Sequence, residues 1–221
     1  ILNSSSLNLI GLSCHIGSQI FELNDFEESA KYIKKLAKEI NKLGIELKFL
    51  DVGGGLGISY TDSNFPSPSN LIKDLENILS DRNEKIILEP GRSVSGDAGI
   101  LLTSVEYVKD DYLIIDAGMN DLIRPALYNA KHDIIPLKKN LSKNSISHDF
   151  VGPICETSDR FLKTKKYQKI NEGDNLAIKD VGAYGIVLSS NYNLRPRPIE
   201  LIIDNLKVKK ISAKQSLNDI I

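Results

Sequence analysis

The sequence has few cysteines and no excess of charge of either sign. Cys14 and Cys155 are its only cysteines, and they lie far apart, outside any metal-ligand spacing. This excludes a dense disulfide framework and favours a reducing compartment, with no metal expected. The 28 basic and 29 acidic residues nearly cancel. No basic face with interleaved aromatic residues is present, so nucleic acid is not an expected partner.

Long apolar runs are also absent. None approaches the roughly 20 residues that a membrane-spanning helix needs, and no basic stretch leads into an apolar one at the N-terminus, as a secretory signal would. We therefore predict a cytoplasmic protein with no membrane partner. Methionine occurs once, as Met119, and the chain opens at Ile1, which predicts that the sequence is not a complete translation product.

The remaining residues divide the chain into two parts. The first hundred residues alternate strand and helix, with strands expected at 7–14, 47–52 and 86–88. From about Gly99 the expected strands follow one another without long helices, at 100–108, 112–116, 175–178, 184–188 and 199–203. We predict an α/β domain over residues 1–98 and an all-β domain, with a short C-terminal helix, over residues 99–221.

Helix boundaries are predicted from capping residues. Asn24 and Glu27 suit a cap and its third-position partner, and Gly44 is placed to end the first helix. Its apolar face would consist of Phe26, Ala30, Ile33, Ala37 and Ile40. Ser67 and Pro68 suit the start of a second helix, which carries Leu71, Leu75, Ile78 and Leu79. Ser212 and Gln215 form a possible capping box for the terminal helix.

A polar or glycine-rich phrase follows each of the first three strands: residues 15–18, 53–57 and 89–92. Because the carboxyl ends of parallel strands meet at one edge, these phrases predict an active-site edge. Three strand–helix units cannot close an eight-stranded barrel and would leave two unpaired sheet edges. We therefore expect further strands from sequence that precedes this chain.

The glycine phrase fits neither common nucleotide motif. A dinucleotide fingerprint would need a glycine at Ile58, and a phosphate-binding P-loop would need a Lys-Ser/Thr pair that is absent. A turn remains in which backbone N–H groups can approach a phosphate closely, or a tight turn without a ligand. Glu89 and Arg92 either pair with each other or hold a heteroaromatic nitrogen and an anionic group.

Several single residues have both a structural and a functional interpretation. His15 alone is more often structural than catalytic, and Cys14 is expected in the core because its side chain alternates with that of His15. Cys155 follows a Gly-Pro turn and precedes Glu156. Neighbouring carboxylates would raise the pKa of its thiol, which disfavours a nucleophilic role but allows the neutral thiol to act as a proton donor. Tyr184 stands close to two glycines and is individually a weak signal.

Taken in order, these phrases resemble the diaminopimelate decarboxylases, which are fold-type III pyridoxal-phosphate enzymes related to ornithine and arginine decarboxylases. The resemblance extends over GLSCHIGSQI, LDVGGGLGISY, EPGRSVSGDAG, DAGMNDLIRPALY, VGPICETSD, GAYG and SSNYNLRPRPIEL. It implies that the chain is the C-terminal portion, with the last three strand–helix units of a (β/α)8 barrel followed by a β-barrel or sandwich domain. It also implies PLP-dependent decarboxylation of meso-2,6-diaminopimelate to L-lysine and CO2, the last step of lysine biosynthesis.

The resemblance assigns roles by position. His15 and Cys155 match catalytic residues: a histidine stacked on the cofactor ring and a proton donor. The cofactor contacts implied by the resemblance are His15, Ser18, Gly53, Gly54, Gly55, Glu89, Gly91, Arg92 and Tyr184. The implied substrate contacts are Arg92, Arg124, Tyr128, Glu156 and Tyr184. Glu89 would keep the pyridine nitrogen protonated.

The resemblance further implies a homodimer with active sites shared between subunits. Nothing in the chain matches the family's cofactor-bearing lysine phrase, Tyr-Ala-Xaa-Lys-Ala-Asn, because Lys31, Lys34 and Lys35 suit the solvated face of a helix. We therefore expect the chain alone to be inactive. The alternatives are a decarboxylase of ornithine, arginine, another basic amino acid or carboxynorspermidine, and a non-catalytic regulatory relative.

Overall fold

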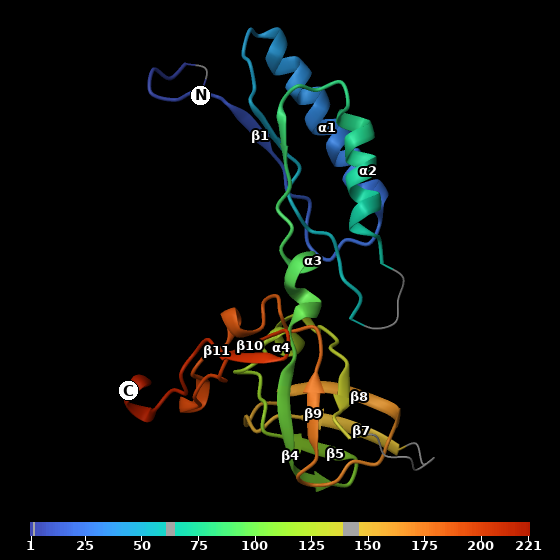
Figure 1. The fold of residues 1–221 in the computed structure, drawn as a ribbon, viewed down its shortest axis with the longest axis vertical. Coiled ribbons are helices and arrows are strands. Elements are labelled where there is room, and N and C mark those ends of the chain that lie inside the picture. Colours follow the sequence, from blue (N-terminus) through green and yellow to red (C-terminus); the bar gives the residue numbers. More distant parts are fainter. Residues whose placement is uncertain (2, 61–64, 139–145) are drawn as a thin grey trace. The chain divides into compact units, whose positions relative to one another are not determined.

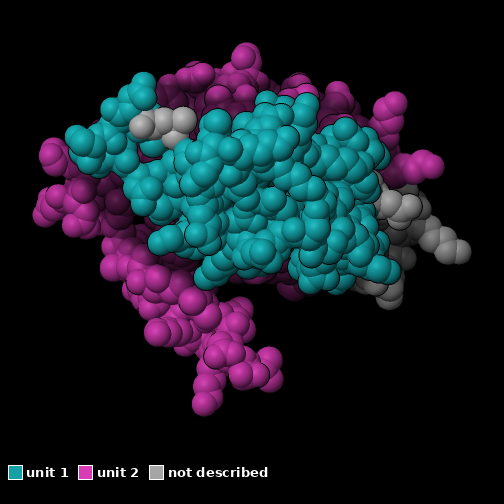
Figure 2. Space-filling view, turned by 90° about the horizontal axis from the view of Figure 1, so that it is seen from above, with its two compact units in different colours: residues 1–95 teal, residues 96–221 magenta. Residues whose placement is uncertain are grey.

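The computed structural model describes residues 1, 3–60, 65–138 and 146–221. Its contacts divide the chain into two compact units, Ile1–Ser95 and Gly96–Ile221, which Figure 2 draws in different colours. Among the described residues, no helix is both long enough and apolar enough to cross a membrane.

Unit 1 (Ile1–Ser95) contains a three-stranded parallel sheet. Its strands, in the order in which they pair, are β1 (Gly11–Ser13), β2 (Phe49–Asp51) and β3 (Lys85–Ile87). Its helices are α1 (Leu23–Lys42), α2 (Pro68–Leu79) and the single turn α3 (Arg92–Ser95). The long helices α1 and α2 lie side by side (Figure 1), and they share one core with Leu50 and Val52. The predicted alternation of strand and helix is confirmed. Strands β1 and β2 are shorter than predicted, and β3 lies one residue earlier than predicted.

The two long helices differ in how well their starts were predicted. In α2, Ser67 is the cap, its side chain accepts a hydrogen bond from the Ser69 N–H, and Pro68 is the first residue, as predicted. In α1, the predicted cap Asn24 is wrong, because the helix already begins at Leu23 and Glu22 stands at the cap position without a side-chain bond. Leu23 packs against the core, which explains why the chain becomes helical before the better capping residue.

The cap of α2 gives a direct test of local stability. Ser67→Ala removes the oxygen that accepts the Ser69 N–H, and such a loss costs about 1 kcal/mol. We expect a corresponding drop in the free energy of unfolding of unit 1, measured by urea denaturation. Ser69→Ala is the matched control, since it keeps both the Ser67 oxygen and the Ser69 N–H. Equal destabilisation by the two substitutions would contradict this role of Ser67.

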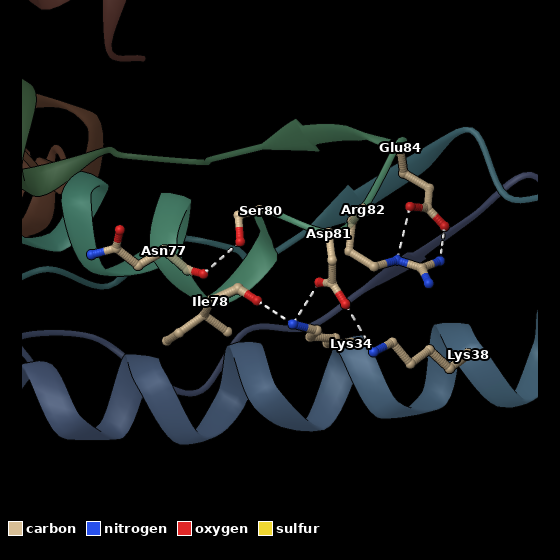
Figure 3. Close-up of polar contacts among 8 residues, drawn as sticks. All are labelled: Lys34, Lys38, Asn77, Ile78, Ser80, Asp81, Arg82 and Glu84. Atoms are coloured by element: carbon tan, nitrogen blue, oxygen red, sulfur yellow. Dashed lines mark hydrogen bonds and ion pairs between the residues drawn. The ribbon is translucent and has the colours of Figure 1, made fainter.

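Lys34 does not lie on a solvated face, contrary to the prediction. Its Nζ donates to the Ile78 carbonyl, and it pairs with Asp81 at 2.6 Å, while Lys38 pairs with the same carboxylate at 2.9 Å (Figure 3). Hydrogen bonds from the two lysines lower the pKa of Asp81. Nearby, Arg82 Nε donates to Glu84 at 3.0 Å. The contacts of Lys34 and Lys38 join α1 to the end of α2 and to Asp81 just after it, so Lys34 has a structural role.

Unit 2 (Gly96–Ile221) is built on a six-stranded sheet. In spatial order its strands are β6 (Ile134–Pro136), β9 (Asn175–Ile178), β4 (Leu101–Lys109), β5 (Tyr112–Ile115), β7 (Ile146–Val151) and β8 (Arg160–Tyr167). Among the described strands of this sheet, β5 and β7 are the only pair that is parallel. The Tyr167 hydroxyl of β8 donates to the Ile134 carbonyl of β6 at 2.6 Å, so the two edge strands approach each other and the sheet is nearly closed. Its interior is apolar and includes Leu113, Phe150 and Ile178.

Three expectations for this unit are wrong. Residues 184–188 are not a strand, because Tyr184 has a φ of +59° and a 3-10 helix follows at Ile186–Leu188. The predicted terminal helix is only a 3-10 turn, Leu217–Asp219, and its capping box is formed by Ser216 and Asp219. Ser212 and Gln215 instead accept hydrogen bonds from residues 12 to 24 positions earlier in the chain.

A separate antiparallel hairpin consists of β10 (Leu201–Asp204) and β11 (Lys207–Lys210).

Candidate active site

In unit 1 the three phrases after the strands come together through their backbones. A Cβ on Gly53 would lie 2.3 Å from the Cys14 carbonyl oxygen, one on Gly54 would lie 2.0 Å from that of Glu89, and one on Gly55 would lie 2.2 Å from that of Gly17. Each distance is shorter than a real contact allows. The glycines are therefore required by the close approach of neighbouring strand ends, whether or not a ligand binds there.

His15 is exposed and its ring is oriented by this glycine turn. The Gly54 N–H donates to His15 Nδ1 at 3.3 Å, so a neutral ring carries its proton on Nε2. Cys14, predicted in the core, is only half-buried, and its Sγ lies 3.2 Å from the Ser29 hydroxyl of α1. The side chains of Cys14 and His15 thus have different environments, as their alternation predicted.

A polar cluster forms beside the glycine turn. Arg92 donates to the hydroxyl of Tyr60 and, at 3.3 Å, to the hydroxyl of Ser18. These residues come from the segments that follow β3, β2 and β1 respectively. A guanidinium held between two hydroxyls next to a glycine-rich turn is suited to an anionic group such as a phosphate.

Glu89 occupies the end of the third strand. Its N–H donates to the Gly53 carbonyl at 2.9 Å, so its backbone is tied to the glycine turn. Its side chain is exposed within unit 1, so the carboxylate can stay charged there without a buried partner. Gly91 begins the α3 turn, since its carbonyl accepts from the N–H groups of Val94 and Ser95.

In unit 2 the predicted substrate residues occupy different environments. Arg124 is 5% exposed, and its guanidinium lies 2.9 Å from Nε2 of His132. His132 Nδ1 lies 2.9 Å from the Lys179 carbonyl, so Nδ1 carries the proton and Nε2 accepts from Arg124. Tyr128, on the same short helix α4 (Arg124–Tyr128), is 64% exposed.

Cys155 and Glu156 are exposed on the turn between β7 and β8. The Tyr192 hydroxyl donates to Glu156 Oε1, and this hydrogen bond raises the pKa of Tyr192. The turn is closed by Asp159, which is 3% exposed and accepts from the N–H groups of Met119 and Ile154 at 2.7 Å each. Burial raises the pKa of Asp159, while the two backbone donors act in the opposite direction.

Tyr184 is partly exposed and has an unusual backbone conformation. It is 44% exposed and has a φ of +59°, a backbone conformation that is unusual for a bulky side chain and often marks functional sites. A Cβ on the following residue, Gly185, would lie 2.3 Å from the Val181 carbonyl oxygen. The turn therefore needs glycine after Tyr184.

Comparisons with known proteins agree with the family resemblance seen in the sequence. Residues 1–96 match the family described as pyridoxal-dependent decarboxylase, pyridoxal binding domain. The chain is similar to pyridoxal-dependent decarboxylases. A diaminopimelate decarboxylase from Aquifex aeolicus is 42% identical over 98% of this chain and 52% of its own length.

Solved structures are also similar to this chain. Diaminopimelate decarboxylase from Helicobacter pylori, complexed with L-lysine, has a TM-score of 0.93 and 40% identity over 99% of this chain and 55% of that one. The enzyme from M. jannaschii in complex with L-lysine has a TM-score of 0.93 and 37% identity over 99% of this chain and 52% of that one. The chain spans about half the length of the curated relatives it matches.

Several residues of the candidate site were not predicted from the sequence. Tyr60 and Tyr192 contact Arg92 and Glu156 from elsewhere in the sequence, and His132 is the buried neighbour of Arg124. For Tyr192 a signal existed, because it lies in SSNYNLRPRPIEL, one of the phrases on which the resemblance rests. Tyr60 similarly ends LDVGGGLGISY. His132 stands outside these phrases, so only the fold shows its role.

Proposed function

We propose that this chain is part of a pyridoxal-phosphate-dependent decarboxylase that converts meso-2,6-diaminopimelate to L-lysine and CO2. The observation that supports this most strongly is the convergence of His15, the Gly53–Gly55 turn and Glu89 at adjacent strand ends, in a chain 42% identical to a diaminopimelate decarboxylase. On this proposal the chain alone is inactive, because no lysine phrase of the family's cofactor-bearing type occurs in it.

The residues of unit 1 fit pyridoxal phosphate. Arg92 and Ser18 would hold the phosphate beside the Gly53–Gly55 turn, since the guanidinium and the Ser18 hydroxyl already lie together at 3.3 Å. His15, held by the Gly54 N–H, would stack on the ring. Glu89 would face the pyridine nitrogen and Tyr184 would add a contact, while Gly91 sets the start of α3 beside Arg92.

When bound, the cofactor would supply an electron sink for the pair left behind when the substrate carboxylate departs as CO2. A carboxylate at Glu89 keeps the ring nitrogen protonated, because a nearby negative charge favours the charged form. Arg92, Arg124 and Tyr128 would bind the charged ends of the substrate, and Glu156, held by Tyr192, would bind its distal amino group. The Cys155 thiol would deliver the proton that replaces the lost carboxylate.

Assembly and architecture form part of the same proposal. Residues 1–98 would be the last three strand–helix units of a (β/α)8 barrel, and residues 99–221 its β domain. The exposed edges of β1 and β3 in the three-stranded sheet are consistent with further parallel strands on either side. The protein would be a cytoplasmic homodimer in which the partner subunit supplies the turn that carries Cys155.

A substrate panel tests the proposal. The chain would be joined to the remaining half of a diaminopimelate decarboxylase, and CO2 release would be measured with meso-diaminopimelate, ornithine, arginine, lysine and carboxynorspermidine. We expect kcat/KM for diaminopimelate to exceed kcat/KM for each of the other substrates by at least about 100-fold. Diaminopimelate carries an amino and a carboxylate group at both ends, and a site that binds both ends rejects substrates that leave its polar groups unpaired. The unjoined chain should release no CO2. Preference for ornithine or arginine would reassign the substrate, and no turnover of any of them would contradict the proposal.

A further inference from the structure

Asp159 links two segments of unit 2 that are far apart in the sequence. One carboxylate oxygen accepts from the Met119 N–H and the other from the Ile154 N–H, both at 2.7 Å. Met119 lies in the loop between β5 and α4, whereas Ile154 lies in the turn between β7 and β8. One side chain, 3% exposed, therefore joins the backbones of both segments.

The backbone of the turn is also organised around Asp159. The Asp159 N–H donates to the Glu156 carbonyl at 3.1 Å, and the Glu156 N–H donates to the Ile154 carbonyl at 2.7 Å. At the base of the turn, the Gly152 N–H donates to the Asp159 carbonyl at 2.9 Å. Cys155 thus lies between two residues, Ile154 and Glu156, whose backbones are each bonded to Asp159.

The carboxylate fits its position closely. A Cβ on Gly152 would lie 2.3 and 2.4 Å from the two carboxylate oxygens, so the turn has no room for a larger residue there. A carboxylate accepts at both oxygens, whereas an amide accepts at one and donates at the other. An asparagine at this position would direct its NH2 group at one of the two backbone N–H donors, so it could satisfy at most one of them.

We propose that Asp159 is a positioning residue for the turn that carries Cys155 and Glu156. Both of those side chains are exposed, so their placement depends on the backbone beneath them and, for Glu156, on Tyr192. Asp159 acts through the turn and touches no substrate. This inference deepens the proposed function, since it concerns how the proposed proton donor and substrate contact are held in place.

Amide hydrogen exchange on the chain itself tests the contacts. In the unsubstituted chain, the Met119 and Ile154 amides should exchange at least about tenfold more slowly than free loop amides, because each donates to a buried acceptor. Asp159→Asn should accelerate at least one of the two, together with Cys155 and Glu156, while Leu113 and Phe150 in the sheet keep their protection. Tyr192→Phe is the matched control, since it removes the Glu156 side-chain contact but no backbone bond, and it should leave Ile154 unchanged.

Two outcomes of the hydrogen-exchange experiment would overturn the proposal. One is rapid exchange of Met119 and Ile154 in the unsubstituted chain, a result that does not depend on whether any variant folds. The other is an Asp159→Asn chain that keeps both amides protected. These measurements do not involve decarboxylation, so they decide the role of Asp159 even if the substrate panel contradicts the proposed function.

Kinetics in the joined enzyme separate positioning from simple stability. Asp159→Asn, assayed well below its unfolding temperature, should lower kcat and raise KM, each by about tenfold, because small misplacements of reacting groups slow catalysis steeply. Glu156→Gln should mainly raise KM, and Cys155→Ala should mainly lower kcat. Unchanged kcat and KM in folded Asp159→Asn enzyme would show that the residue stabilises the fold without positioning the turn, and would overturn the proposal.

Discussion

Gly54→Ala is expected to prevent unit 1 from folding stably. The added Cβ would lie 2.0 Å from the Glu89 carbonyl oxygen and 2.9 Å from its carbon, both of them backbone atoms at the end of the neighbouring strand. Backbone cannot move aside as a flexible side chain can, so β2 and β3 would have to separate. We expect the free energy of unfolding to fall by more than about 3 kcal/mol, at the upper end of overpacking effects, measured by urea denaturation and by soluble yield.

Gly44→Ala is the matched control in the same unit. Gly44 follows α1 with a φ of +80° and has nothing within 4 Å of the position of its Cβ. Its replacement therefore adds backbone strain without a clash, which costs about 1–2 kcal/mol. Equal destabilisation by the two substitutions would show that steric approach at Gly54 is not what requires glycine.

Glu89→Gln is expected to reduce decarboxylation in the joined enzyme by at least about 100-fold, the scale on which a single well-placed electrostatic group acts in catalysis. Glutamine has nearly the same shape as glutamate but no negative charge, so it cannot keep a ring nitrogen protonated. The loss should fall on kcat, while the KM for substrate changes little. Steady-state kinetics with meso-diaminopimelate measure both quantities.

Glu39→Gln provides the comparison for Glu89→Gln. Glu39 lies on the exposed side of α1, so its replacement changes the charge of unit 1 by the same amount away from the strand ends. We expect unchanged kcat and KM. Glu89→Gln enzyme with full activity would contradict the role proposed for this carboxylate, whereas a large loss in both variants would indicate a general effect of charge.

The elements of unit 1 were predicted well where the signal is local. Ser67 and Pro68 mark the start of α2 because a hydroxyl at the cap and a proline at the first position act within one turn. The apolar spacing of α1 likewise identified its buried residues Phe26, Ala30 and Ile33. Asn24 failed as the cap of α1, since the packing of Leu23 against the core extends the helix past the locally preferred start.

Unit 2 was predicted less completely. Strands β4, β5, β9 and β10 were expected close to their observed positions, whereas β6, β7, β8 and β11 were not expected at all. Strand β8 carries four lysine and arginine residues, so its sequence lacks the regular alternation of apolar and polar residues that predicts a strand. Residues 184–188 suggested a strand by composition, but the positive φ of Tyr184 turns the chain there.

By itself, the sequence determined the order of strands and helices in unit 1, the polar phrases at the strand ends and the family resemblance, since each depends on residues near one another in the chain. Tertiary structure alone decided which backbones crowd Gly53–Gly55 and which groups hold the candidate side chains. Asp159 reaches Met119 and Tyr192 reaches Glu156 across long stretches of sequence. Such contacts depend on where the fold brings distant segments, and neither periodicity nor local spacing contains that information.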